Sequence, residues 1–247
     1  MRNIKLLIQY DGTRYSGWQS QEHTDQTIQG KLQAVLERMT GESIEVHGSG
    51  RSDAGVHARG QVANFKTHAQ LSCEEILHYV NQYLPEDIAV LDAEDVDVRF
   101  HSRLNAAEKT YVYRIWNSSV PNVFERKYLY SMEEPLDVEA MRKAASLLCG
   151  THDFKAFCSN KRMKKSSVRT VKEIGIRQQG AEIRLSFTGN GFLYNMVRIL
   201  TGTLVEVGLH KKKPEDMPGI LQSLDREQAG FTAPAQGLYL EQVVYGE

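Results

Sequence analysis

The order in which two hydrophobic periodicities follow each other constrains the fold of this 247-residue chain more than any other feature. A short apolar run typical of a strand is followed by side chains spaced as on one face of a helix, and further strand and helix patterns come after them. From residue 109 the same alternation begins again. The predicted strands are 4–10, 43–47, 61–66, 88–91, 109–116, 171–177, 182–187 and 238–245. The predicted helices are 28–39, 72–84, 137–150, 192–205 and 214–224.

These two rounds indicate two α+β halves, which we place at residues 1–105 and 106–247. The boundary falls in an irregular stretch at 100–107. We expect two similar halves of the ferredoxin or RNA-recognition-motif (RRM) type, with mainly antiparallel sheets joined into one extended sheet. Helices are expected to cover one face of the sheets, and an active-site cleft to lie between the halves.

Charge is segregated along the chain, although the net charge is only −1. Bulk charge therefore does not indicate nucleic-acid binding, and a site for a polyanion has to come from local clustering. One basic cluster, residues 155–169, contains no acidic residue, and its cations can neutralise phosphates. A solvated charge run is the ordinary alternative. The cluster holds Lys155, Lys161, Arg162, Lys164, Lys165 and Arg169.

The sequence predicts a cytoplasmic protein that makes no membrane contact. No apolar run approaches the roughly 18 residues that cross a bilayer, and the first residues lack the apolar region of a signal peptide. Cys73, Cys149 and Cys158 have no close paired spacing, which fits neither a disulfide framework nor a thiolate metal site. We interpret the cysteines as reduced packing residues.

The most unusual segment is residues 47–58, in which glycines bracket Arg51, Asp53 and His57. Glycines allow backbone conformations that bulkier residues resist, so the segment can present Arg51 and Asp53 on a tight loop. A polar turn with Asp53 as a local cap is the simpler interpretation. The segment is not a phosphate-binding P-loop, because no Gly-Lys-Ser/Thr follows it. His57 is expected to be structural, since the histidines lack metal-binding spacing.

Five separate motifs resemble one enzyme family. The segment Gly-Arg-Ser-Asp-Ala-Gly-Val-His-Ala, at 50–58, is similar to the signature of the tRNA pseudouridine synthase A (TruA) family, which commonly has Thr where this chain has Ser52. Agreement continues in Tyr-Asp-Gly-Thr with Gly-Trp-Gln near the start, and in Lys-Thr-Tyr-Val-Tyr-Arg at 109–114. It extends to Gly-Thr-His-Asp-Phe at 150–154 and to Gly-Asn-Gly-Phe-Leu-Tyr-Asn-Met-Val-Arg at 189–198.

The resemblance implies a tRNA pseudouridine synthase that isomerises uridine to pseudouridine at positions 38, 39 and 40 of the anticodon arm. The family uses one indispensable carboxylate, which corresponds to Asp53. Bond cleavage and religation within one nucleotide need no redox change, so neither a cofactor nor a metal is expected. The resemblance also implies a homodimer that shares each tRNA between its subunits. Whether the carboxylate attacks the base or the sugar, or assists removal of a sugar proton, stays open.

The same resemblance assigns roles to other residues. Arg198 is expected to form an ion pair with Asp53, and its apolar helix is expected to be largely buried. Tyr111 is expected to stack on the target base, although alternation alone cannot separate it from Tyr113. Arg51 is expected to hold the flipped nucleotide out of the stack; without the family it is equally a phosphate contact or a loop ion pair. The expected contacts to the tRNA backbone are Lys161, Arg162, Lys164 and Lys165.

Two other function classes compete with this interpretation. A non-catalytic RNA-binding module would make Asp53 dispensable, but a carboxylate among RNA-binding groups would weaken phosphate binding. A glycosidase would need a second carboxylate near Asp53 as acid or base. Glu42 and Glu45 lie on the approach to the loop and do not supply one.

Overall fold

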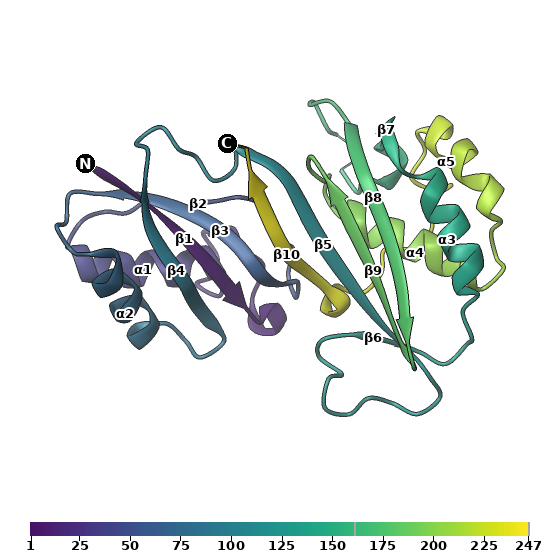
Figure 1. The fold of residues 1–247 in the computed structure, drawn as a ribbon, viewed down its shortest axis with the longest axis horizontal. Helices are drawn as coiled ribbons and strands as arrows, with labels where there is room; N and C mark the ends of the chain where they lie inside the picture. The colour runs from purple at the N-terminus through teal and green to yellow at the C-terminus, as the bar shows by residue number, and fades with distance from the viewer. Residues whose placement is uncertain (161, 247) are drawn as a thin grey trace. The chain divides into compact units, whose positions relative to one another are not determined.

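A computed structural model describes residues 1–160 and 162–246, which form two compact units (Figure 1). The first unit contains residues 1–107 together with 239–247, and the second contains residues 108–238. The last strand of the chain therefore belongs to the first unit. Each unit combines a mostly antiparallel sheet with helices, which confirms the predicted α+β class.

The sheet of the first unit has the strand order β4, β1, β3, β10. β1 (Arg2–Tyr10) lies between β3 (His57–Thr67) and β4 (Ile88–Val96) and pairs antiparallel with both. β10 (Leu238–Tyr245) pairs with β3 in parallel, and the short β2 (His47–Gly48) pairs with β3 antiparallel. β3 thus pairs with three strands, β1 and β2 from before it in the chain and β10 from the end of the chain.

Two helices cover one face of this sheet. α1 (Ile28–Thr40) begins where the Thr27 side chain accepts a hydrogen bond from the helix backbone, and α2 (Cys73–Tyr83) begins at a capping box of Ser72 and Glu75. The helices pack their apolar stripes against the alternate β1 side chains that are fully buried. The buried residues are Ile4, Leu6 and Ile8 of β1, Ile28, Leu32 and Leu36 of α1, and Ile76 and Val80 of α2.

The sheet of the second unit has the strand order β5, β9, β8, β7. β5 (Ala106–Asn117) pairs with β9 (Glu182–Gly189), which pairs with β8 (Val168–Gln179), and β8 pairs with β7 (Gly150–Asp153); all three pairings are antiparallel. β6 (Tyr130–Met132) adds a short parallel pairing to β5. The sequence patterns predicted β5, β8 and β9, whereas β6 and β7 were too short to be recognised.

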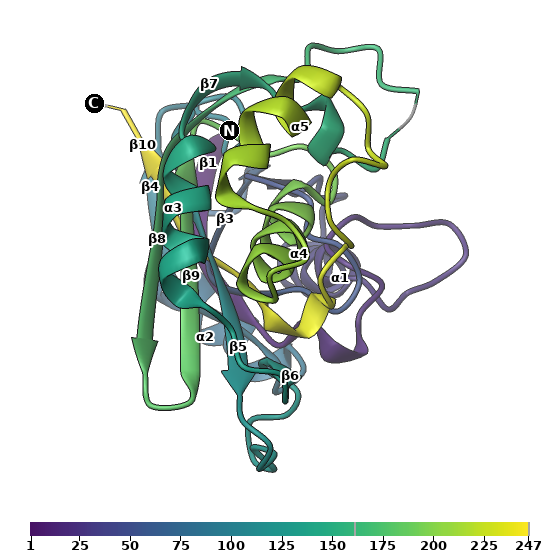
Figure 2. The same cartoon turned by 90° about the vertical axis from the view of Figure 1, so that its right-hand side faces the viewer.

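Three helices lie together on one side of β8 and β9 (Figure 2). They are α3 (Val138–Leu147), α4 (Met196–Gly208) and α5 (Met217–Ser223). Every residue of α4 except Arg198 and Glu206 is buried, which confirms the prediction of a largely buried helix. Four 3₁₀ helices occur in the described residues: η1 (Gly12–Arg14), η2 (Lys155–Phe157), η3 (Pro214–Asp216) and η4 (Ala235–Gly237).

Several predicted elements are longer or shorter in the structure, and two of the differences have a clear local cause. The strand predicted at 43–47 was mostly wrong, because only His47 of that range joins a ladder and the amide of Ile44 bonds instead to the Glu37 side chain at 3.2 Å. The helix predicted at 192–205 begins only at Met196, because Asn195 has a left-handed backbone with φ 61°. The spacing of apolar residues predicts neither the hydrogen bond of Ile44 to Glu37 nor the left-handed backbone of Asn195.

Candidate active site

The Gly-rich segment forms a loop between β2 and β3, and a buried side chain of β3 holds its first residues. Gln61 is fully buried, and its Oε1 accepts a hydrogen bond from Ser49 Oγ at 2.6 Å. The Gln61 Nε2 donates to the carbonyl oxygen of Gly50 at 3.1 Å. The amide of Ser49 also donates to the carbonyl of Val62 at 2.7 Å. The start of the loop is therefore tied to the core of the sheet.

Residues 11–27, between β1 and α1, form the first loop of the chain, and this first loop holds the centre of the Gly-rich loop. The amide of Trp18 donates to the carbonyl of Ser52 at 3.1 Å, and the amide of Gly55 donates to the carbonyl of Tyr15 at 3.3 Å. These two bonds lie on either side of Asp53. Backbone contacts from the chain's first loop thus define where the Asp53 main chain lies.

Asp53 itself is half-buried, and the turn that contains it is closed by the backbone. The amide of Val56 donates to the Asp53 carbonyl at 3.1 Å. The hydroxyl of Tyr10 lies 2.8 Å from Ser52 Oγ and links the neighbouring residue to the end of β1. Arg51 is exposed, as a contact to an external ligand requires.

Two glycines of the first loop lie so close to the turn that contains Asp53 that neither position has room for a side chain. A Cβ atom on Gly12 would lie 2.0 Å from the carbonyl oxygen of Val56. A Cβ atom on Gly17 would lie 2.5 Å from the carbonyl oxygen of Ser52, and Gly17 has φ 97°, a conformation that favours glycine. The contact of the two loops accounts for both glycines.

His57 packs at the end of the loop. Its side chain is 2% exposed, its Nδ1 accepts a hydrogen bond from the Gly12 amide at 3.0 Å, and Asp11 Oδ1 lies 3.2 Å from the same nitrogen. The imidazole lies 4.9 Å from the ring of Tyr239. These contacts fit the structural role expected for His57 and join β3 to the start of the first loop.

The second unit separates Tyr111 from Tyr113, which their spacing could not do. Tyr113 is fully buried, and its hydroxyl donates to the carbonyl of Pro234 at 2.7 Å. Tyr111 is only partly buried; it lies opposite Phe187 in the β5–β9 ladder and meets Phe192 edge-on, with ring centroids 5.3 Å apart. Tyr113 is a core residue, whereas Tyr111 retains an accessible aromatic surface.

Arg198 projects from the first turn of α4, and two acceptors orient its guanidinium. Its Nε donates to the carbonyl of Ala233 at 2.7 Å, and its Nη1 donates to Oδ1 of Asn195 at 3.0 Å. The side-chain Nδ2 of Asn195 in turn donates to Ser159 Oγ at 3.0 Å. The predicted ion pair with Asp53 would join residues of the two units and stays a prediction.

The basic loop lies between η2 and β8. Arg162, Lys164 and Lys165 are exposed, and Asn160 Oδ1 accepts a hydrogen bond from the Arg162 amide at 3.0 Å. Their exposure suits contacts to phosphates and equally suits a solvated charge run. Lys161, which was also predicted to contact RNA, lies outside the described residues.

Sequence reasoning assigned no role to three residues that shape these positions. Gln61, Phe192 and Asn195 respectively hold the Asp53 loop, pack against Tyr111 and orient Arg198. Phe192 and Asn195 fall inside a motif that was noticed only as a resemblance. A buried Gln in a strand carries no periodic signal, so only the structure identifies Gln61.

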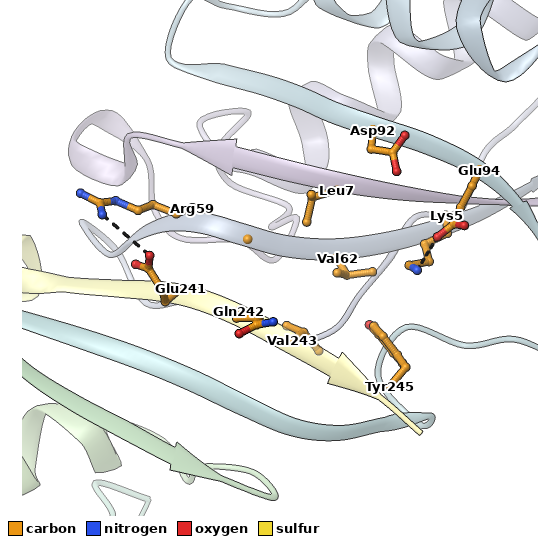
Figure 3. A pocket seen from close by; sticks show the side chains of 11 residues that line it. Lys5, Leu7, Arg59, Val62, Asp92, Glu94, Glu241, Gln242, Val243 and Tyr245 are labelled. Atoms are coloured by element: carbon orange, nitrogen blue, oxygen red, sulfur yellow. Dashed lines mark hydrogen bonds and ion pairs between the residues drawn. The ribbon is translucent and has the colours of Figure 1, made fainter. Parts of the chain in front are cut away.

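A pocket lies on the other face of the first unit's sheet, the one that α1 and α2 leave open (Figure 3). Lys5 lines it and forms an ion pair with Glu94, and Arg59 pairs with Glu241 at 3.8 Å. Tyr245 lies at one end. None of the predicted site residues that the structure describes lines this pocket, and its paired charges do not indicate a ligand.

Metal sites and membrane spans were also sought in residues 1–160 and 162–246. Within these ranges no group of three or more His, Cys, Asp or Glu side chains is arranged to hold a metal ion. Among the helices described, the longest have 13 residues, and none has the length and apolar character to cross a membrane.

Comparison with known proteins relates nearly the whole chain to one group of enzymes. A family described as tRNA pseudouridine synthase matches residues 6–105 and 144–246. A protein of Bacillus sp. (strain KSM-64), named tRNA pseudouridine synthase A, is 51% identical over 99% of this chain and 100% of its own length. A Clostridium tetani protein named tRNA pseudouridine synthase A 2 is 46% identical over 99% of both chains. An Acetivibrio thermocellus protein named tRNA pseudouridine synthase A is 44% identical over 99% of this chain and 100% of its own.

Proposed function

Because the chain belongs to the tRNA pseudouridine synthase family, we propose that it isomerises uridine to pseudouridine in tRNA with Asp53 as its catalytic carboxylate. The observation that carries the assignment of Asp53 is the construction of its loop. Backbone bonds to Trp18 and Tyr15 fix the chain on both sides of Asp53, while Arg51 remains exposed beside it. A rigid support of this kind is what a reacting group needs.

The reaction exchanges one glycosidic bond for another within a single nucleotide. The bond from the ribose C1′ to N1 of uracil breaks, the base turns, and a bond from C1′ to C5 forms. C5 loses its proton and N1 gains one, so the product is an isomer of the substrate. A carboxylate at Asp53 serves this sequence in its ionised form, by attack on the base or the sugar or by assisting removal of a sugar proton.

Three further residues complete the proposed site. Tyr111 stacks on the flipped uracil, and the edge-on contact with Phe192 supports this role by holding the ring in place. Arg51 occupies the space that the flipped nucleotide leaves. Arg198 pairs with Asp53 and favours its ionised state, since a nearby cation lowers the pKa of a carboxylate.

The proposed substrate is the anticodon arm, with uridines 38, 39 and 40 as targets. The exposed cations Arg162, Lys164 and Lys165 support this proposal as contacts to phosphates, which position the RNA without selecting the base. Lys161 belongs to the same proposed group. We place the reaction in the cytoplasm, where this substrate is available.

We further propose that the enzyme is a homodimer that shares each tRNA between its subunits. The loop between β5 and β6 supports self-association, because three apolar side chains lie exposed close together in its sequence, and a cluster of this kind is typical of an interaction surface. Val120, Val123 and Phe124 are 69%, 58% and 94% exposed. Light scattering at micromolar concentration tests the dimer, and a monomeric mass would contradict it.

The assignment of Asp53 is tested by chemical mapping of pseudouridine in an unmodified tRNA transcript. The wild type is expected to modify the anticodon arm, and Asp53→Asn is expected to form no product while still binding tRNA. Asp92→Asn is the matched control, because Asp92 is an exposed carboxylate that lines the pocket on the open face of the same sheet. Unchanged product from Asp53→Asn, or none from the wild type on any tRNA, would sink the proposal.

A further inference from the structure

A carboxylate in the turn between α2 and β4 is largely buried against the first loop of the chain. The side chain of Asp87 is 11% exposed. Its Oδ2 accepts two hydrogen bonds from the Arg14 guanidinium, at 2.9 and 2.6 Å, and its Oδ1 accepts one from the Tyr15 hydroxyl at 2.5 Å. Asp87 therefore holds two consecutive residues of the loop.

Tyr15 connects Asp87 to the turn that contains Asp53. Its side chain is buried, and its carbonyl oxygen accepts the hydrogen bond from the amide of Gly55 at 3.3 Å. Burial raises the pKa of Tyr15, and the hydrogen bond to Asp87 raises it further, so the hydroxyl remains a donor at physiological pH. One residue thus bonds Asp87 through its side chain and Gly55 through its backbone.

A second contact holds the same segment. The amide of Asp11 donates to the backbone carbonyl of Asp87 at 2.9 Å. On the opposite side of the segment, Gly12 lies against the carbonyl of Val56, where a Cβ atom would be only 2.0 Å away. The residues after β1 are therefore clamped between the Asp87 turn and the Asp53 loop.

We propose that Asp87 is a positioning residue for the isomerisation, which acts through Tyr15 on Gly55 and so sets the position of Asp53. The inference rests on the proposed role of Asp53. Asp87 touches neither the substrate nor the reacting atoms in this scheme. Its effect comes from geometry, because a misplacement of about 1 Å in a catalytic group can lower a rate by about 100-fold.

The two partners of Asp87 contribute differently to this function. Arg14 is 67% exposed, and an exposed ion pair contributes little. Tyr15 is only 5% exposed, so the loss of its partner carboxylate costs more than the loss of the exposed Arg14 pair. The contact with Tyr15 is therefore the one that transmits position, and Arg14 supplies a control.

The test compares kcat and KM for an unmodified tRNA transcript tritiated at uridine C5, from which product formation releases the label. Asp87→Ala and Tyr15→Phe are expected to lower kcat by about tenfold or more while KM changes less than about twofold. Asp87→Asn is expected to recover most of the rate, because its amide oxygen still accepts from Tyr15. Arg14→Gln is expected to keep the wild-type kcat.

Two further variants keep the test decisive. Val80→Ala removes buried methyl groups of α2 and none of the hydrogen bonds that join Asp87, Tyr15 and Gly55, so it matches a general loss of stability and is expected to keep its kcat. A wild-type kcat in Asp87→Ala, or an equal loss in Arg14→Gln or Val80→Ala, would overturn the positioning role. Asp53→Asn is assayed in parallel to separate the two claims. Activity in Asp53→Asn would refute the proposed function. An inactive Asp53→Asn together with a fully active Asp87→Ala would refute only the positioning role of Asp87.

Discussion

The hydroxyl of Tyr10 lies 2.8 Å from Oγ of Ser52, so the last residue of β1 bonds the residue that precedes Asp53. Burial raises the pKa of Tyr10 to about 12, and the hydroxyl remains protonated at physiological pH. The contact gives the hydroxyl at position 52 a structural role. Thr, which the resembled signature carries there, keeps the same group.

Replacing either hydroxyl of this pair is expected to loosen the Asp53 loop. Tyr10→Phe and Ser52→Ala should each lower the free energy of unfolding by about 1 kcal/mol, the net contribution of a typical hydrogen bond, and should reduce kcat. Ser52→Thr should keep both near the wild-type values. Urea denaturation and pseudouridine formation measure the two effects, and a fully active Ser52→Ala would count against the role of the hydroxyl.

Gly17 is the next position at which the loop contact can be tested. Gly17→Ala would force a side chain into φ 97° and place its Cβ 2.5 Å from the carbonyl of Ser52. We expect a loss of about 1 to 3 kcal/mol in stability together with loss of activity. Gly219→Ala is the control. Gly219 lies in α5, and a Cβ atom at this position would meet no other atom within 4 Å. The control should be neutral or about 0.5 to 1 kcal/mol more stable.

Much of the fold was predictable because most of its helices and strands have local sequence signals, namely apolar periodicity and helix caps. α1 and α2 have clear apolar stripes, and the helix predicted from residue 72 begins in the structure at the Ser72–Glu75 capping box. β10 shows the limit of such patterns. Its residues were recognised as a strand, but no sequence pattern says that a strand at the end of the chain pairs with β3. Pairing between distant segments depends on tertiary contacts.

The candidate site was predictable only in part, for a related reason. Asp53, Tyr111 and Arg198 were identified by motif resemblance, and nothing in their local spacing assigns a role to them. The contacts that support them come from residues far along the chain, such as Gln61 beneath Gly50 and Ala233 beside Arg198. Hydrogen bonds of this kind leave no periodicity, so the sequence alone did not reveal them.

A buried ion pair in the second unit predicts how stability depends on pH. Arg114 is 6% exposed, and its Nε donates to Oε1 of Glu182 at 2.6 Å. The Arg114 guanidinium, with help from Arg184, lowers the pKa of Glu182 from 4.5 to about 2. A carboxyl whose pKa is lower in the folded state stabilises the protein above its unfolded pKa. This contribution is therefore full above about pH 5 and disappears as the pH falls from about 4.5 to about 2.

Glu182→Gln should lower the free energy of unfolding at pH 7 by about 2 kcal/mol, because the Gln oxygen can still accept from Arg114 but no longer carries the negative charge that compensates a largely buried Arg. The difference from the wild type should shrink as the pH falls from about 4.5 to about 2, because the carboxyl of the unfolded wild type binds a proton in this range while that of the folded protein stays ionised. Glu133→Gln, which changes an exposed carboxylate, is the control. Urea denaturation followed by circular dichroism measures the difference, and a gap that is constant with pH would contradict the assignment.

The basic loop makes a prediction about salt. If Arg162, Lys164 and Lys165 contact phosphates, replacing all three with Gln releases fewer counterions when tRNA binds. The slope of log Kd against log salt concentration should then fall by about 2 to 3, at roughly 0.7 to 0.9 for each lost phosphate contact. The product should still form at saturating tRNA, because these side chains position the RNA and do not react.

The control for this experiment has the same change in net charge. Lys66, Lys127 and Lys143 are exposed cations outside the basic loop, and the triple Gln variant at these positions lowers the charge equally. An equal fall in slope for both variants would mean that tRNA senses only the overall charge of the protein. A smaller slope in the loop variant alone would mean that phosphates lie against the loop, because counterion release counts close contacts and not distant charge.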